Sequence, residues 1–269
     1  MLITSPQNPR IKELVKLKNR RKRDERKVVL IEGYRAVLSA LENNFKLSEI
    51  YYCPDLYLGE NETKLVELAI KGGAKDFQTT KDVFIKIAYR DRPEGIIAIA
   101  PQVHHKLEDL KVDDHSLFLV AEAIEKPGNL GTMLRSSDAA RISGVIVCDP
   151  RTDVYNPNVV RASIGTLFTV PIVTTNTEEF VLWKDKHDIT TLATTPSATT
   201  IYTDVDMTGR VALILGTEQV GLSDEWLEMA DEKILIPMYG QADSLNVSAA
   251  TTLVLFEAVR QRRLKGILS

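Results

Sequence analysis

The sequence predicts an α/β protein, and three observations lead to this fold class. Segments with strand and helix patterns alternate along the 269 residues. Apolar runs such as Val211–Leu215 are typical of parallel strands that are covered on both faces. With 44% hydrophobic and 26% charged residues, the composition is that of a globular protein and excludes a chain that is disordered throughout.

The first half of the chain predicts a small α/β domain that begins with a basic helix. Asn8 and Pro9 suit a helix start, and Ile11, Leu14 and Val15 recur at helical spacing. The elements expected next are a strand, a helix, a strand, a helix and a strand, over residues 28–32, 34–42, 49–53, 63–71 and 95–101. A polar stretch follows, where few contacts are expected. We therefore expect a domain over residues 1–105 and a linker over residues 106–115.

The second half predicts a larger α/β domain over residues 116–269. Strands are expected over residues 116–121, 144–148, 170–174, 190–194, 211–215 and 233–236, and helices over residues 129–141, 157–167, 177–186 and 247–265. Ligands of parallel sheets bind at the carboxyl ends of the strands. The loops that follow these strands are therefore the expected place for a functional site.

Several protein classes are not supported by the sequence. The apolar runs are far shorter than the ~20 residues of a membrane span, and the N-terminal segment lacks the pattern of a signal peptide. Cys53 and Cys148 form no CxxC arrangement, and the four histidines have no metal-motif spacing. We expect a cytoplasmic protein with two buried reduced thiols, no membrane association and no metal.

Charge is distributed unevenly along the chain. The net charge is −3, yet residues 1–30 contain ten Lys and Arg against three Asp and Glu, a local charge of +7. Lys12, Lys16, Arg20 and Arg23 are predicted to share one face of the basic helix, where they suit an RNA phosphate backbone. A solvated helix face without a ligand is the alternative interpretation of this segment.

Three polar loops follow predicted strands and contain the candidate site residues. The first contains Asn129 and Arg135 at a helix start, the second places Glu218 between Gly216 and Gly221, and the third ends with Ser244 and Asn246. Each has a structural alternative, because Asn and Ser are common helix caps and glycines are common in turns. Three such loops at strand ends nevertheless favour a shared site.

These loops resemble the three motifs of the SpoU (TrmH-type) RNA ribose methyltransferases of the SPOUT superfamily. The matching stretches are Asn-Leu-Gly-x-x-x-Arg at 129–135, Gly-Thr-Glu-x-x-Gly-Leu at 216–222 and Ile-Pro-Met-x-Gly-x-x-x-Ser-Leu-Asn-Val-Ser at 236–248. The stretch Arg161-Ala-Ser-Ile-Gly also resembles a segment of this family. The first half resembles the family's small RNA-substrate-binding domain, chiefly through Ser5-Pro-Gln-Asn-Pro-Arg and Glu32-Gly-Tyr-Arg.

The resemblance implies transfer of a methyl group from S-adenosyl-L-methionine to a ribose 2′-hydroxyl of RNA. It implies a C-terminal domain with a trefoil knot, an exception to the rule of unknotted chains. It also implies a homodimer whose sites borrow residues across the interface, with ribosomal RNA (rRNA) as the favoured target. By matching motif positions, the cofactor would be bound by Thr194, Gly216, Ile236 and Leu245.

By family likeness Arg135 is the central catalytic residue. Guanidinium groups stay protonated in proteins, so we expect Arg135 to hold the phosphate beside the target and to stabilise charge on the 2′-oxygen. Asn129 and Asn246 would orient Arg135 or the ribose, and Ser244 would form a hydrogen bond nearby. Glu218 would fix its loop or pair with Arg135.

Other functions stay open at this point. The resemblance also fits a transfer RNA 2′-O-methyltransferase and a non-catalytic RNA-binding protein on the same fold. A nucleotide-dependent oxidoreductase or kinase is suggested only by the alternation of strands and helices. The sequence contains neither a GxGxxG turn nor a GxxxxGK[ST] loop, which disfavours this last class.

Overall fold

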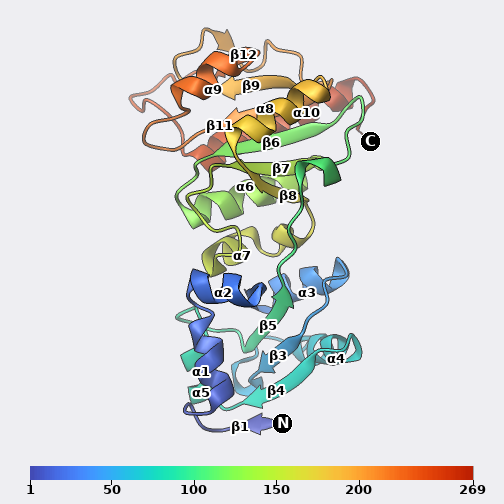
Figure 1. Cartoon of the computed structure of the whole chain (residues 1–269), viewed down its shortest axis with the longest axis vertical. Helices are drawn as coiled ribbons and strands as arrows, with labels where there is room; N and C mark the ends of the chain where they lie inside the picture. The colour runs from blue at the N-terminus through green and yellow to red at the C-terminus, as the bar shows by residue number, and fades with distance from the viewer. Residues whose placement is uncertain (269) are drawn as a thin grey trace. The chain divides into compact units, whose positions relative to one another are not determined.

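The structure is a computed structural model that describes residues 1–268. The chain forms two compact units (Figure 1). Unit 1 comprises Met1–Val103 and Asp153–Thr169, and unit 2 comprises His104–Thr152 and Val170–Ser269. The return of Asp153–Thr169 to unit 1 was not expected from the sequence. The expected domain limits at residues 105 and 116 divide the chain by its sequence pattern, and they stay a prediction. The two compact units are instead defined by which residues pack together.

Unit 1 is built on a mixed sheet of five strands in the order β1-β4-β3-β5-β2. β3 and β1 are parallel to β4, whereas β5 pairs antiparallel with both β3 and β2. The strands are β1 (Leu2–Ile3), β2 (Val28–Glu32), β3 (Glu49–Tyr52), β4 (Lys75–Thr79) and β5 (Ile96–Pro101). The predicted strands over 28–32, 49–53 and 95–101 are confirmed to within one residue at each end.

Helices cover both faces of the unit 1 sheet. Alternate strand residues, among them Tyr51 and Ile97, enter one core with Ile11 and Phe84 from α1 and α5. On the other face α3 and α4 contact the sheet, and α7 contacts β2. The helices are α1 (Pro9–Lys16), α2 (Arg20–Arg26), α3 (Tyr34–Glu42), α4 (Glu62–Lys71), α5 (Lys81–Ile87) and α7 (Pro157–Ser163), with 3₁₀ turns η1 (Pro54–Leu56) and η3 (Thr166–Phe168).

The basic N-terminal segment forms two helices, so the expected single helix was wrong. α1 ends at Lys16, and Asn19 then caps α2 because its side chain accepts a hydrogen bond from the Arg21 N–H at 2.9 Å. Leu17, between the two helices, is fully buried in the core. The cap and the anchor interrupt the row of cations that a continuous helix would have presented.

Unit 2 contains a fully parallel sheet of seven strands in the order β10-β12-β9-β11-β6-β7-β8, which confirms the predicted parallel sheet. The strands are β6 (Leu117–Glu122), β7 (Gly144–Cys148), β8 (Ile172–Thr175), β9 (Thr190–Thr194), β10 (Thr200–Ile201), β11 (Val211–Leu215) and β12 (Glu232–Leu235). The central strands β6, β7 and β11 are buried along their whole length. Their apolar runs are the reason that the pattern was readable from the sequence.

Two layers of helices enclose the unit 2 sheet. On one face Phe118 and Ile214 pack with Phe180 and Trp183 of α8 and with Trp226 of α9. On the other face α10 contacts β11 and α6, and α6 contacts β7. The helices are α6 (Pro127–Ala139), α8 (Thr177–Lys186), α9 (Asp224–Met229) and α10 (Val247–Leu264), with the 3₁₀ turn η2 (Leu107–Asp109).

Several elements of the structure were not predicted from the sequence. β4, α2, α5 and α9 were not foreseen, and Leu107 and Leu110, in the expected linker, are buried in the unit 2 core. Cys53 and Cys148 are buried and free, as expected. No helix within residues 1–268 combines the length and apolarity needed to cross a bilayer. The trefoil knot stays a prediction.

Candidate functional site

A cavity of about 480 Å³ lies at the carboxyl ends of three neighbouring strands of unit 2. Its walls come from residues 194–197 after β9, residues 215–222 after β11 and residues 236–247 after β12. This is the position that open parallel sheets offer to ligands. We call it the unit 2 cavity.

The loop after β11 is a tight turn that requires its two glycines. The Thr217 N–H donates to the Gly221 carbonyl at 3.0 Å, and the Gly221 N–H donates back to the Thr217 carbonyl at 3.1 Å. A Cβ on Gly216 would lie 2.3 Å from the Gly221 oxygen, and Gly221 has a φ of +72°. Larger residues are therefore excluded at Gly216, and the turn holds Glu218 at the cavity wall.

Glu218 is the centre of a hydrogen-bond network that joins the cavity loop to two helix starts. One of its oxygens accepts from the side-chain amides of both Asn129 and Asn246, and the other pairs with the Lys126 ammonium. Asn246 also donates to the Asn129 oxygen at 3.3 Å. The predicted residues Asn129, Glu218 and Asn246 are therefore brought together, although they lie in three separate loops.

The charge of Glu218 is stabilised by this environment. The hydrogen bond from Lys126 is the main cause of a pKa below its ordinary value of 4.5, and the Asn129 amide adds to the effect. Positive helix-dipole ends at α6 and α10 act in the same direction. Lys126 was not selected from the sequence, although it stands three residues before Asn129 in the same loop.

Asn246 and Asn129 have different places on their helices. Asn246 caps α10, with its oxygen accepting from the Ser248 N–H at 3.0 Å, while its amide reaches Glu218. The expected cap role and the expected site role are thus combined in one side chain. Asn129 lies inside the first turn of α6, whose cap residue is Lys126.

The residues expected to bind the cofactor all line the unit 2 cavity, as does Ser244. They are Thr194, Gly216, Ile236 and Leu245. The Thr194 hydroxyl is buried and has no hydrogen-bond partner within residues 1–268. The volume is within the ~300–1,000 Å³ of small-molecule sites, and apolar walls combine there with a few polar groups. The cavity therefore suits a ligand with an apolar body and polar ends.

Arg135 is the predicted catalytic residue that the structure brings neither to the lining of the unit 2 cavity nor to the Glu218 network. It is exposed on α6, and it does not line the unit 2 cavity of its own chain. Its neighbour Ser136 is buried and bonds to Thr252 of α10 through their hydroxyls at 2.7 Å. Of the two roles expected for Glu218, the contacts within the chain agree with fixing the loop and not with pairing to Arg135.

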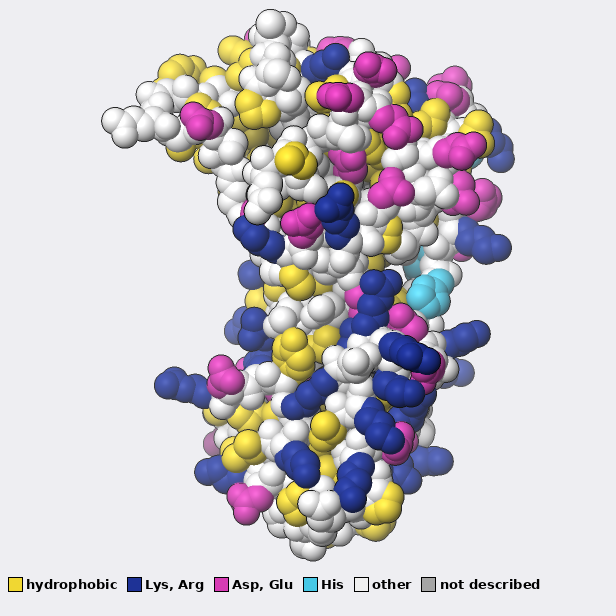
Figure 2. Space-filling model, turned by 60° about the vertical axis from the view of Figure 1, so that its left-hand side comes forward, with side chains coloured by type: hydrophobic (Ala, Val, Ile, Leu, Met, Phe, Trp, Pro, Cys, Tyr) yellow, Lys and Arg dark blue, Asp and Glu magenta, His cyan; other side chains and the backbone are white. Residues whose placement is uncertain are grey.

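The predicted RNA-binding residues are in unit 1. Figure 2 shows Lys and Arg side chains gathered over the part of unit 1 that carries α1 and α2. Lys12, Lys16 and Arg20 are exposed, and Lys16 and Arg20 pair with Glu13 and Asp24 of their own helices. Arg23 was wrongly assigned to this surface.

Arg23 is 1% exposed and is used in packing. Its guanidinium donates to the Leu17 and Lys18 carbonyls at 2.9 and 3.0 Å and pairs with Asp153. The break between α1 and α2 turns this side chain inward. A helical-wheel argument assumes one continuous helix and has no signal for such a turn.

No group of three or more His, Cys, Asp or Glu side chains within residues 1–268 is arranged to hold a metal ion.

Comparisons with known proteins agree over both units. The SpoU rRNA Methylase family profile matches residues 116–256, and the MRM3-like substrate binding domain profile matches residues 8–98. The 23S rRNA (guanosine(2553)-2′-O)-methyltransferase RlmP of Bacillus subtilis (strain 168) is 28% identical over 254 residues, which cover 94% of this chain and 97% of that protein.

Solved structures give the same result. An AdoMet-bound rRNA methyltransferase from Sinorhizobium meliloti is 31% identical with a TM-score of 0.88, covering 100% of this chain and 99% of that one. A crystal structure described as an RNA 2′-O ribose methyltransferase is 38% identical with a TM-score of 0.87, covering 98% of this chain and 100% of that one.

Proposed function

The chain belongs to the SpoU rRNA methylase family, and from this premise we propose that it methylates a ribose 2′-hydroxyl of rRNA with S-adenosyl-L-methionine as donor. One observation carries the proposal. Glu218, Asn129 and Asn246, from the three motif loops, meet beside a cavity of about 480 Å³ at the strand ends. A fold retained only for RNA binding has no need of this arrangement.

The target is proposed from relatives of known target. The Bacillus subtilis protein and the RlmB protein of Escherichia coli (strain K12) are both named 23S rRNA 2′-O-methyltransferases. Because the first of these is matched along nearly its whole length, we propose 23S rRNA as the substrate. We also propose a cytoplasmic location, because that is where the enzyme would meet ribosomal RNA.

The cofactor is proposed to occupy the unit 2 cavity. When bound, S-adenosyl-L-methionine supplies a methyl group that its sulfonium already activates. Ile236 and Leu245 would cover its apolar parts, Gly216 would allow close approach of the backbone, and the unpaired Thr194 hydroxyl would gain a partner. The Glu218 network keeps the cavity loop in place before any ligand arrives.

The chemistry left to the protein is to hold the ribose oxygen in line and to stabilise its developing charge. A guanidinium keeps its protons, so Arg135 would act as a donor to the target phosphate and to the 2′-oxygen and not as a base. The proton would leave to phosphate or water. Ser244, which lines the cavity, and Asn246, which is bonded to Glu218 beside it, would orient the ribose.

Arg135 requires a second copy of the chain to meet a cavity. Since it does not line the cavity of its own chain, we propose a homodimer in which Arg135 serves the partner's site. α10 packs beside α6 and exposes Leu253 and Phe256, which are 41% and 44% exposed. Large apolar side chains on one helix face suit an interface between copies.

The test is methyl transfer from radiolabelled S-adenosyl-L-methionine to protein-free 23S rRNA. We expect label in RNA, recovered after nuclease digestion as one 2′-O-methylnucleoside, and none with Arg135→Ala protein purified in the same way. Titration calorimetry with the cofactor should show binding to both proteins. Label in transfer RNA instead would correct the target, and absence of cofactor binding would overturn the proposal.

A further inference from the structure

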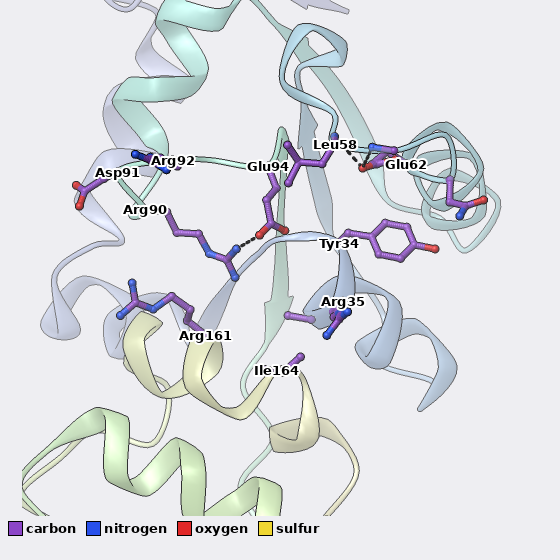
Figure 3. Close-up of a pocket in the computed structure, with 13 residues that line it drawn as sticks. Tyr34, Arg35, Leu58, Glu62, Arg90, Asp91, Arg92, Glu94, Arg161 and Ile164 are labelled. Carbon is purple, nitrogen blue, oxygen red and sulfur yellow. Dashed lines mark hydrogen bonds and ion pairs between the residues drawn. The ribbon is translucent and has the colours of Figure 1, made fainter.

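A second hollow of about 980 Å³ lies entirely within unit 1, and the proposed chemistry does not use it. Its walls are the start of α3, the loop at 58–62, the loop at 90–94 and α7. Figure 3 shows Arg35 and Arg161 approaching it from α3 and α7, and Arg90 and Arg92 from the loop before β5. We call it the unit 1 hollow.

Three of the four arginines of the unit 1 hollow have free guanidinium groups. The side chains of Arg35, Arg92 and Arg161 are exposed, and they make no hydrogen bond or ion pair with any of residues 1–268. Arg90 differs, because it pairs with Glu94 and reaches the Glu32 carbonyl at 3.5 Å. The hollow therefore holds cations that lack a partner and one that shapes the wall.

The carboxylates of the hollow do not neutralise the free arginines. Glu94 is engaged by Arg90. Glu62 is 5% exposed and accepts from the Leu58 and Gly59 N–H groups at 3.1 and 2.9 Å. Asp91 is the remaining carboxylate of the lining and is exposed. One exposed carboxylate thus stands against three free arginines, and the net unpaired charge in the hollow is positive.

The walls are fixed by buried groups. Glu32 is 6% exposed and accepts from the Tyr89 N–H at 2.7 Å and the Arg90 N–H at 3.4 Å, which fastens the loop at 90–94. Gly33 has a φ of +99°, and a Cβ there would lie 2.9 Å from a Glu94 oxygen. Gly33 precedes α3 and supplies no side-chain cap, and the first three residues of α3 line the hollow.

α7 brings Arg161 into unit 1 from the part of the sequence that matches the methylase family. The segment is anchored at both ends, because Asp153 pairs with buried Arg23 and the Gly165 carbonyl accepts from the Ser39 hydroxyl at 2.8 Å. A Cβ on Gly165 would lie 2.5 Å from the Ser39 Cβ. Arg161 thus stands at a fixed place in the wall.

We propose that the unit 1 hollow binds a short single-stranded stretch of the substrate RNA, with Arg35, Arg92 and Arg161 on its phosphates and one unstacked base on Tyr34. Guanidinium groups bind phosphate through paired hydrogen bonds. Tyr34 is half-buried in the wall, and an aromatic ring beside cations is the usual platform for an unpaired base. This inference rests on the proposed function, since it assigns part of the same RNA to a second place.

The experiment measures binding of a fluorescent single-stranded RNA of about 12 nucleotides to the full chain by anisotropy across a salt series. The test variant is R35Q/R92Q/R161Q. Its matched control is K46Q/K71Q/K75Q, which removes the same charge from exposed positions of unit 1 outside the hollow. Circular dichroism checks that both variants are folded.

We expect the test variant to bind roughly 30-fold more weakly than wild type, with a salt slope lower by about 2, and the control to change far less. Tyr34→Ala should weaken binding between about 5- and 100-fold, and Tyr34→Phe should restore it because the ring is kept. Equal losses in test and control, or equal effects of the two Tyr34 variants, would overturn the proposal.

Two further arms identify the ligand. Competition by AMP or inorganic phosphate that displaces RNA from the wild-type protein, at concentrations that do not displace the RNA still bound by R35Q/R92Q/R161Q, would show a free-nucleotide site and overturn the RNA assignment. Duplex RNA of the same length should bind the test variant and wild type with similar affinity. Cofactor binding by the test variant should equal that of wild type, so loss of RNA binding alone separates this inference from the proposed function.

Discussion

The unit 2 cavity and the unit 1 hollow are both polar, yet their charged groups are arranged in opposite ways. In the cavity, Glu218 already has three partners supplied by the chain. In the hollow, Arg35, Arg92 and Arg161 have none within residues 1–268. The cavity is organised before its ligand arrives, whereas the hollow keeps its positive charge for a ligand that brings negative charge.

The difference follows from how far the charged side chains are exposed to water. The Glu218 side chain is 17% exposed and its partners stand at the starts of two packed helices, so an unpaired carboxylate would be costly there. The free arginines are exposed, so water satisfies them until a phosphate replaces it. Salt therefore weakens binding at the hollow far more than binding in the cavity.

The largest effect is expected at Arg135, which belongs neither to the Glu218 network nor to the free arginines of the unit 1 hollow. Arg135→Ala should lower the rate of methyl transfer roughly a thousandfold, because the donor to the developing charge is lost. Arg135→Lys should recover little, since an ammonium lacks the paired geometry of a guanidinium. Single-turnover rates with 23S rRNA measure both, and near-normal rates would remove Arg135 from the chemistry.

The homodimer can be tested with the same variant. The Arg135→Ala protein keeps its unit 2 cavities. The Gly216→Val protein keeps Arg135, but the valine side chain does not fit the turn after β11 that lines the cavity. If Arg135 serves the partner's site, random reassociation of the two inactive proteins should restore about a quarter of the wild-type rate. A mixture that stays inactive after subunit exchange would place Arg135 in its own chain's site or in none.

The next largest effect separates the buried arginine from the exposed cations of unit 1. Arg23→Gln should destabilise unit 1 by about 3 kcal/mol, because it leaves Asp153 and two carbonyls without a buried partner. K12Q/K16Q/R20Q should leave stability unchanged, but weaken RNA binding roughly fivefold. Circular dichroism reports unit 1 alongside unit 2, whereas both tryptophans lie in unit 2, so their fluorescence isolates that unit.

The result is decided by which signal moves. An Arg23→Gln protein with wild-type denaturation by circular dichroism would show that the buried pair is not needed for folding. A salt slope that is unchanged in K12Q/K16Q/R20Q would leave the α1 and α2 surface as a solvated face, the alternative that the sequence alone kept open.

Elements with strong local signals were predictable. β7 and β11 are continuous apolar runs, β2 and β6 are apolar up to a final Glu, and Asn8 with Pro9 marks the start of α1. α2 was missed because the burial of Leu17 depends on tertiary packing that a charged stretch does not show, although the Asn19 cap is a local signal. β4, Lys75–Thr79, was missed because Phe77 is its one apolar residue, so its sequence does not alternate between apolar and polar residues.

The candidate site was predictable where residues lie in sequence motifs and not where they meet only in space. Glu218, Asn129 and Asn246 were each selected from a loop after a strand, and the parallel sheet brings these loops to one edge. The unit 1 hollow unites Arg35, Arg92 and Arg161, which are far apart in the sequence. No periodicity or spacing links them, because α7 reaches unit 1 only through the fold.

A smaller effect is expected from Glu218→Gln, which tests whether the cavity is organised in advance. The new side-chain NH₂ group must face at least one of the donors Lys126, Asn129 and Asn246, and it cannot accept from them. The loop at 216–222 therefore loses part of its anchorage. We expect about tenfold weaker cofactor binding by calorimetry. Glu225→Gln on α9 makes the same chemical change at an exposed position and should bind normally. Equal affinity in both proteins would mean that the network is not needed for the cofactor.

The smallest effect is a pH dependence whose sign differs between the two regions. Lys126 lowers the pKa of Glu218, so its contribution to stability is present above its ordinary pKa of 4.5 and is lost as pH falls through the lower folded value. Burial raises the pKa of Glu32, so stability instead decreases as pH rises from 4.5 through the higher folded value.

Denaturation between pH 4 and pH 7 should therefore move in opposite directions for two variants. Relative to wild type, Glu218→Gln should lose stability as pH rises, read by tryptophan fluorescence of unit 2. Relative to wild type, Glu32→Gln should gain stability over the same range, read by circular dichroism. The same sign in both would show that the two carboxylates share one kind of environment, and the contrast between a satisfied cavity and an open hollow would then rest on the arginines alone.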